Sequence, residues 1–264
     1  MPETLYKYRS LSENNYEFTR EIFLQNKLYF PHPDQINDPF DCKIPPSRKN
    51  RSKKEYLAHL EKIKSKTNDC NVLAIINSAI ANVNSNDMET IEQKLYEQYK
   101  KSNLQNVGVL SLSKKPLDIR MWSHYADSHR GICIGFDYEK LLFTFNHTPQ
   151  CAHEVNYPKL NEYPLWDYLD RNDEEIIVKL FLTKALYWKY EQEWRIVLPE
   201  KGRTLKKFHP TAMVSVYLGC QISKKHKEDV IDWCLRREQK PKIYQTTKSE
   251  SSYSLQTEEI LYNK

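Results

Sequence analysis

The chain has 264 residues and a modest formal net charge of +5, so it is long enough for one substantial hydrophobic core or two small ones. It contains only five glycines, and neither of the glycine-rich nucleotide-binding loops, G-x-G-x-x-G or G-x-x-x-x-G-K-[ST], occurs. No apolar run is long enough for a transmembrane helix, and the first residues lack the features of a secretion signal, so we expect a cytoplasmic protein with no membrane partner. The six scattered cysteines form no C-x-x-C pair, so we expect reduced thiols.

The first hundred residues are predicted to form strands, one helix and an inserted helical block. In chain order, we predict a strand at 5–9, a helix from Ser12 to about Gln25, a strand at 28–30 and a turn at 37–41. Residues 52–103 are predicted to form two or three helices that cover a sheet, because apolar residues recur there at three- and four-residue spacing, at Met88, Ile91, Leu95 and Tyr99.

The remaining residues alternate between strand and helix patterns. In chain order, we predict a strand at 107–112, a helix at 118–126, a strand at 131–136, a helix at 172–181, strands at 193–198 and 214–218, a helix at 224–238 and a hairpin at 242–262. The fold class is therefore α+β, with a mixed or antiparallel sheet core, an inserted helical block at about 52–103 and a C-terminal strand-helix-hairpin. No repeat or linker is visible, which favours a single domain over residues 1–264.

Residues 120–130 are the first segment rich in reactive side chains. A metal site is one interpretation, because His124, Asp127 and His129 lie close together in the sequence. Zinc sites on helices prefer histidines four residues apart with a further ligand elsewhere, and that spacing is missing here. We therefore expect no bound metal and regard His124 and Tyr125 as lining a pocket.

A second such segment, residues 187–195, contains two alternating carboxylates. On a strand, Glu191 and Glu193 would face the same side, and Arg195 would lie on that side as well. Two like charges side by side raise one pKa unless a cation compensates. We expect Trp122 and Trp188 to be largely buried and to pack the two segments against each other.

Several motifs together resemble the bacterial domain-of-unknown-function 2971 family. They lie at residues 5–9 (LYKYR), 37–41 (NDPFD), 121–137 (MWSHYAD followed by HRGICIGFD) and 184–197 (a Lys followed by WKYEQEWRIV). The resemblance covers a core at about 4–200 and leaves residues 201–264 as a C-terminal extension. It implies no activity.

A weaker resemblance is to ADP-ribosyltransferases of the Arg-Ser-Glu type, on the order of Arg9, the Ser111-Leu-Ser113 triplet and the Glu191-Gln-Glu193 triplet. That resemblance implies that Arg9 contacts the phosphates of NAD and that Ser111 and Ser113 support the site around the nicotinamide ribose. Glu193 would be the catalytic carboxylate that stabilises an oxocarbenium-like state, with Glu191 positioning the acceptor. Arg195 would complete the cofactor-binding set. We predict that Arg9, Ser111 and Glu193 line one cleft.

The leading hypothesis is an NAD-consuming ADP-ribosyltransferase-like enzyme or glycohydrolase, of the kind found in toxins and antiphage effectors, with NAD as substrate. A nuclease or other nucleic-acid-processing enzyme, using His124 and His129, is the second hypothesis, since basic runs at 48–54, 201–207 and 224–227 could bind phosphates. The third is a non-catalytic module that senses a nucleotide or binds a protein. The sequence names no protein partner.

Overall fold

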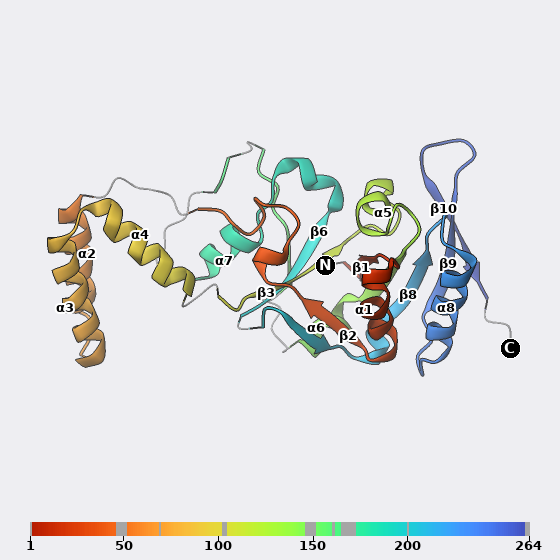
Figure 1. The fold of residues 1–264 in the computed structure, drawn as a ribbon, viewed down its shortest axis with the longest axis horizontal. Coiled ribbons are helices and arrows are strands. Elements are labelled where there is room, and N and C mark those ends of the chain that lie inside the picture. The colour runs from red at the N-terminus through yellow and green to blue at the C-terminus, as the bar shows by residue number, and fades with distance from the viewer. Residues whose placement is uncertain are drawn as a thin grey trace. The chain divides into compact units, whose positions relative to one another are not determined.

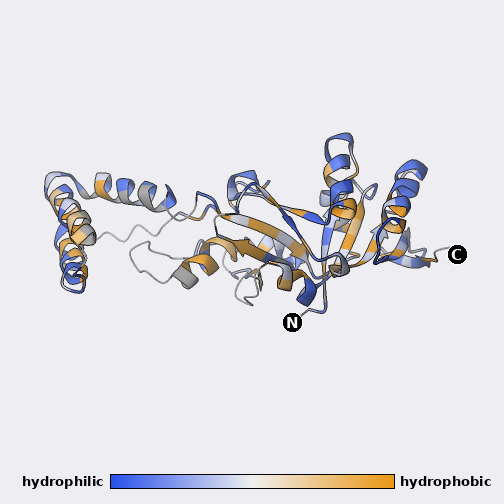
Figure 2. Ribbon diagram, turned by 90° about the horizontal axis from the view of Figure 1, so that it is seen from below, coloured by the Kyte–Doolittle hydropathy of each residue, from blue (hydrophilic) through white to orange (hydrophobic). Residues whose placement is uncertain are grey.

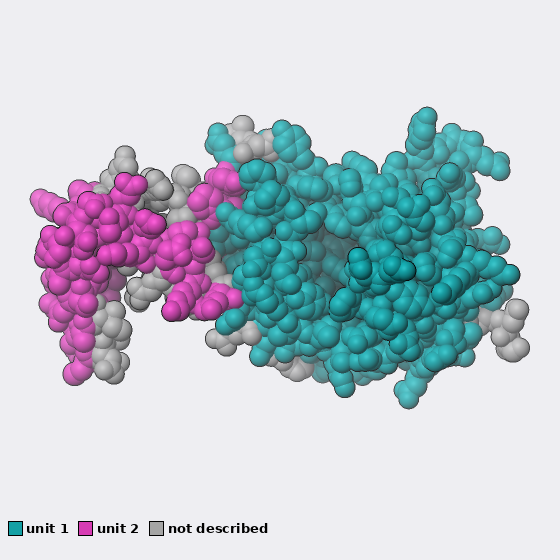
Figure 3. Space-filling view, viewed as in Figure 1, with its two compact units in different colours: residues 1–43, 106–162, 177–264 teal, residues 44–105, 163–176 magenta. Residues whose placement is uncertain are grey.

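The computed structural model describes residues 2–45, 52–68, 70–101, 105–145, 152–159, 162–164, 173–199 and 201–261. The chain divides into two compact units (Figure 3). The first consists of residues 1–43, 106–162 and 177–264, and the second of residues 44–105 and 163–176. Whether the whole chain acts as a single domain stays a prediction. No helix in the described ranges has the length and apolar character needed to cross a membrane.

The first unit is built on a mostly antiparallel sheet (Figure 1). From one edge to the other, its described strands are β10 (Leu255–Ile260), β9 (Lys242–Lys248), β8 (Met213–Leu218), β4 (Ile132–Asp137), β1 (Thr4–Arg9), β3 (Gly108–Ser113), β6 (Glu193–Leu198) and β5 (Ala152–Glu154). Among these described strands, only β8 and β9 pair in parallel, and helix α8 (Lys224–Leu235) is the crossover that a parallel connection requires. A separate two-stranded sheet pairs β2 (Lys27–Phe30) with β7 (Thr204–Lys207).

Helices cover both faces of this sheet. Alternation along each strand sends Leu5 and Ile134 into a large apolar core with the helices α1 (Glu13–Leu24), α6 (Tyr138–Thr144) and α8. The other face receives Tyr8 and Cys133, which pack against Trp122 of helix α5 (Ile119–Tyr125). Figure 2 shows the hydrophobic residues concentrated on these strands. Each fully buried apolar side chain contributes roughly 1.5–3 kcal/mol to folding.

The second unit is helical where the structure describes it. Its helices α2 (Lys53–Lys64), α3 (Cys70–Ser85) and α4 (Met88–Tyr99) share an apolar cluster that includes Tyr56, Val83 and Ile91. They confirm the helical block expected at 52–103, whereas the side chains of Met88, Leu95 and Tyr99 lie outside the described set. Helix α7 (Asp173–Phe181) spans the boundary between the two units along the chain.

The predicted fold class is confirmed, and each predicted strand and helix has a counterpart. Short elements were missed: β5, β7, α6 and the 3₁₀ helices η1 (Pro33–Gln35), η4 (Leu186–Glu191) and η5 (Pro210–Ala212). These elements have three to seven residues, which is too short for an apolar period to be visible.

Candidate functional site

The candidate site is a cavity of about 380 Å³ in the first unit. Strands β1 and β3, the loop after β2, helix α5 and the segment from Lys184 to Glu193 form its walls. Its polar and charged lining residues are Tyr6, Lys7, Tyr8, Gln35, Asn37, Asp41, Ser111, Ser113, His124, Tyr125, Lys184, Glu191 and Glu193. Two segments nearly seventy residues apart in the sequence, around His124 and Glu191, therefore meet at one cavity.

Behind the cavity lies a buried ion network centred on Arg195, whose side chain is completely buried. Its Nε and Nη2 donate to Glu193 at 2.7 and 2.9 Å, and its Nη1 and Nη2 donate to Asp41 at 2.8 and 2.5 Å. The remaining Nη1 donor reaches the carbonyl oxygen of Phe181 at 2.8 Å. All five guanidinium donors are therefore used inside the protein, and none is left for a ligand.

Lys184 forms the second cation of the network. Its Nζ lies 2.6 Å from Glu191 Oε2, 3.1 Å from Glu193 Oε2 and 3.6 Å from Asp41 Oδ2. Burial alone would lower the pKa of this lysine, but the three carboxylates raise it well above its usual value. Lys184 therefore stays charged and joins the two glutamates.

The pKa values of the two glutamates are shifted in opposite directions. Burial alone would raise the pKa of Glu193, but Arg195 and Lys184 hold it well below its usual range. The pKa of Glu191 is raised, because burial and the neighbouring Glu193 charge outweigh the single Lys184 cation. Glu193 is thus a fixed anion, whereas Glu191 takes up a proton more readily than an ordinary glutamate.

Local backbone geometry explains why both carboxylates reach Lys184. Glu191 is the last residue of η4, Gln192 has a left-handed φ of 43°, and Glu193 begins β6. Glu191 and Glu193 therefore do not lie on one continuous strand, but the left-handed turn at Gln192 leaves both carboxylates on the same side, within 3.1 Å of the Lys184 ammonium. The Ser113 hydroxyl donates to the backbone oxygen of Glu191 at 2.6 Å, and the backbone N–H of Glu193 donates to the Tyr157 hydroxyl at 3.0 Å.

Helix α5 supplies the opposite wall. Its N-cap is Asp118, whose side chain accepts from the backbone N–H of Arg120. At its last turn, the Tyr125 hydroxyl donates to Glu191 Oε1 at 2.7 Å. Burial and the Glu191 charge raise the pKa of Tyr125, so this hydroxyl remains a donor.

His124 joins the aromatic residues of η4. Its ring centroid is 6.5 Å from that of Trp188, 6.4 Å from that of Tyr190 and 6.2 Å from that of Tyr125. These ring contacts set the position of the His124 imidazole, which also lines the cavity. As predicted, His124 and Tyr125 lie in the same pocket as Glu191.

Arg9 does not lie with the other predicted residues. Tyr6 of β1 is paired with Ser113, and Ser113 with Glu193, so these residues share one face of the sheet. Arg9 is three positions from Tyr6 and therefore faces the other side, where its Nε donates to Thr19 of α1 at 3.3 Å. The prediction that Arg9, Ser111 and Glu193 line one cleft is wrong for Arg9, although Ser111 and Glu193 both line the cavity.

The tryptophan predictions are confirmed only in part. Trp122 is completely buried, and its Nε1 donates to the carbonyl oxygen of Pro116 at 2.8 Å. Trp188 is only half-buried, and it lies on the short η4 helix beside Lys184. Trp194 faces the large core on the opposite side of the sheet and packs on Tyr138, so it does not line the cavity.

Three charged residues were missed by the sequence interpretation: Lys7, Asp41 and Lys184. All three belong to the motifs that carry the family resemblance, which was the one available signal. A lysine or an aspartate can be recognised as a buried counter-ion only when its partners are known, and those partners are up to 154 positions away.

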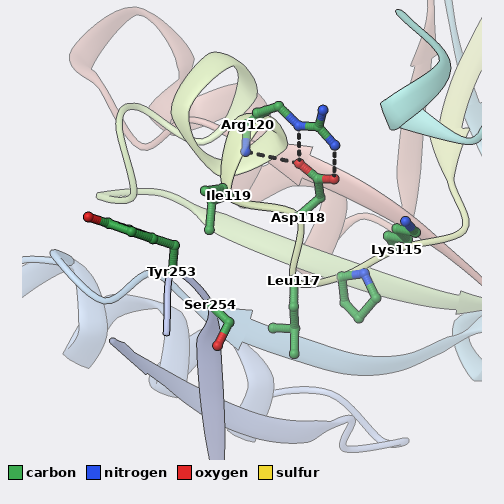
Figure 4. A pocket seen from close by; sticks show the side chains of 8 residues that line it. Lys115, Leu117, Asp118, Ile119, Arg120, Tyr253 and Ser254 are labelled. Atoms are coloured by element: carbon green, nitrogen blue, oxygen red, sulfur yellow. Dashed lines mark hydrogen bonds and ion pairs between the residues drawn. The ribbon is translucent and has the colours of Figure 1, made fainter. Parts of the chain in front are cut away.

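A larger hollow, of about 620 Å³, lies between the start of α5 and the β9–β10 hairpin (Figure 4). Its carboxylate, Asp118, is already bound by Arg120 through donors at 3.1 and 2.8 Å, and Tyr253 at its rim is fully exposed. Among its lining residues no other acid is present. This hollow therefore offers less for chemistry than the smaller cavity.

The first metal interpretation involved His124, Asp127 and His129. The His129 ring stacks on Trp122 and its Nε2 lies 3.2 Å from Ser123 Oγ, whereas His124 lines the cavity. Within the described ranges, no three His, Cys, Asp or Glu side chains are grouped to hold a metal ion. That the purified protein contains no metal stays a prediction.

Comparison with protein families supports the resemblance found in the sequence. Residues 121–196 match the family described as "Protein of unknown function (DUF2971)". The matched range begins on α5 and ends on β6, and it contains His124, Tyr125, Lys184, Glu191 and Glu193. No curated protein and no solved structure matches the chain.

Proposed function

We propose that the cavity is an enzyme active site in which Glu191 is the reacting carboxylate. One observation carries this proposal: Glu191 lines the cavity with a raised pKa, and both of its oxygens are oriented, by Tyr125 at 2.7 Å and by Lys184 at 2.6 Å. A carboxyl group with a raised pKa is suited to accept and return protons near neutral pH. A fixed orientation is the second requirement for such a group.

The reaction that fits best is cleavage of an N-glycosidic bond, with NAD as substrate. The bond between the ribose C1′ and the nicotinamide nitrogen breaks, and nicotinamide leaves with the bonding electron pair. Water or an acceptor hydroxyl then adds to the oxocarbenium-like carbon, and its proton passes to the Glu191 carboxylate. Water gives a glycohydrolase and another hydroxyl gives a transferase.

This proposal assigns different roles from those that the sequence suggested. Glu193 holds Arg195 and Lys184 in place and keeps a negative charge behind the site. Ser113 fixes the Glu191 backbone, and Arg195 is a structural cation without a free donor. Loss of NAD from cells would account for a role as a toxin or antiphage effector.

Release of nicotinamide from NAD by the purified protein tests the proposal. Glu191→Gln should reduce the rate about a hundredfold or more, as expected for loss of a general base, while NAD binding persists. Glu154→Gln is the matched control, because Glu154 is an exposed carboxylate on β5 that pairs with Lys114 at 2.8 Å. Tight nucleotide binding without turnover would instead make the protein a sensor, and strand cleavage of nucleic acid would make it a nuclease.

A further inference from the structure

The cavity lies where the central sheet opens. Strand β1 is paired with β4 through six residue pairs, and β3 with β6 through six, but β1 and β3 share only the pair Tyr6 and Ser113. Beyond that pair the two strands separate, and residues 6–8 and 111–113 become opposite walls of the cavity. The backbone groups of this stretch are therefore not all used by the sheet.

Lys7 leaves β1 on the same side as Leu5 and Arg9, and its ammonium reaches into this opening because β3 is not paired with β1 here. Its Nζ donates to the carbonyl oxygen of Ser111 at 2.8 Å, in place of a backbone partner from β1. The side chain is half-buried and lines the cavity. An ammonium group has three donors, and this single bond is the one that the described residues provide for it.

Lys7 also differs from Lys184 in its counter-ions. Lys184 lies within 4.0 Å of three carboxylates, whereas no carboxylate among the described residues forms an ion pair with Lys7. Burial, and then the nearby Arg9 charge, lower the pKa of Lys7 to about 8, although Glu193 and Glu191 oppose this. Removing a cation partly from water without a counter-ion is costly, and a bound anion would offset that cost.

We propose that Lys7 binds a phosphate group of the ligand in the opening between β1 and β3, while the reacting carbon lies at Glu191. This inference rests on the proposed function only for the choice of ligand. A cavity of about 380 Å³ lies at the lower end of the range for small-molecule sites. It therefore holds the nicotinamide mononucleotide half of NAD, with the phosphate at Lys7, and leaves the adenosine half outside.

The proposal is tested by comparing nicotinamide mononucleotide with nicotinamide riboside, which lacks only the phosphate. Binding is measured by calorimetry in a Glu191→Gln background, so that turnover does not interfere. Lys7→Met should weaken binding of the mononucleotide about ten- to a hundredfold, the effect of losing a charge-assisted hydrogen bond, and should leave binding of the riboside unchanged. Lys114→Met is the matched control, because Lys114 directly follows β3 but pairs with Glu154 and does not line the cavity.

Lys7→Gln serves as a second variant if the methionine variant fails to fold, because its amide can still donate to Ser111. Equal affinity for the mononucleotide in both Lys7 variants and the parent would overturn the inference, and so would an equal loss for both ligands. Failure of the wild-type protein to release nicotinamide, with Lys7-dependent binding of the mononucleotide intact, would overturn the proposed reaction and leave this inference standing.

Discussion

Replacing Glu193 with glutamine should destabilise the protein, because this carboxylate is a counter-ion of two buried cations. It accepts two hydrogen bonds from Arg195 and one from Lys184, at distances of 2.7, 2.9 and 3.1 Å. Glutamine keeps the volume and one acceptor oxygen but removes the charge and places an NH₂ group against donors. Breaking a buried ion pair costs about 3–5 kcal/mol. Asp41 remains beside both cations, so we expect a loss of about 3 kcal/mol.

Thermal and guanidinium unfolding of the two glutamate variants gives the measurement. A loss of about 3 kcal/mol corresponds to a Tm lower by roughly 6–12 °C at this chain length. Glu191→Gln should stay within about 1 kcal/mol of wild type, because the fold already disfavours the charge on Glu191. Equal stability of Glu193→Gln and wild type would refute this reasoning, as would an equal loss in both variants.

Three further predictions concern stability and composition. Trp122→Ala should lower the free energy of unfolding by about 3–5 kcal/mol, because the Trp122 ring is completely buried. Trp188→Ala should lower it clearly less, because the Trp188 ring is half-exposed. Similar melting curves for the two variants would contradict this difference in burial. Because Arg195 and Lys184 lower the pKa of Glu193 despite its burial, its stabilising contribution is present at neutral pH and is lost as the pH falls below about 4.3, the unfolded value. Acid titration of stability should therefore be shallower in Glu193→Gln than in wild type, and parallel curves would argue against this. Elemental analysis should find no stoichiometric metal in the purified protein, and stoichiometric zinc would favour the nuclease hypothesis.

Local patterns predicted the elements of the fold well. The helix begins directly after Ser12, as the residue type predicts, although the Ser12 side chain makes no capping hydrogen bond. The strand at Glu193–Leu198 follows from an apolar run, which acts within a few residues. Strand order is set by pairing between distant segments, and it was not predictable. The pairing of Tyr6 with Ser113, which opens the sheet, has no local signature.

The candidate site was predictable in only some of its residues, and their roles were not predictable. The charged segments around His124 and Glu191 do meet at one cavity. The prediction for Arg9 was wrong because the side of the sheet that its side chain faces depends on strand register. A shift by a single residue reverses that side. The distinction between Glu191 and Glu193 depends on Arg195, which donates to Glu193 and not to Glu191, and on the distance of each carboxylate from Lys184, which no spacing rule gives.

The division of roles between the two glutamates is tested most directly by NMR titration of their side-chain carboxyl carbons. Glu191→Gln and Glu193→Gln assign the two signals in protein labelled with ¹³C at the glutamate carboxyl carbon. We predict that the Glu191 carboxyl titrates above the ordinary value of about 4.3, and that the Glu193 carboxyl stays ionised to well below that value. Addition of nicotinamide mononucleotide should shift the Glu191 signal and leave that of Glu193 nearly unchanged. A Glu191 carboxyl with an ordinary pKa and no response to the ligand would contradict the assignment of Glu191 as the reacting carboxylate.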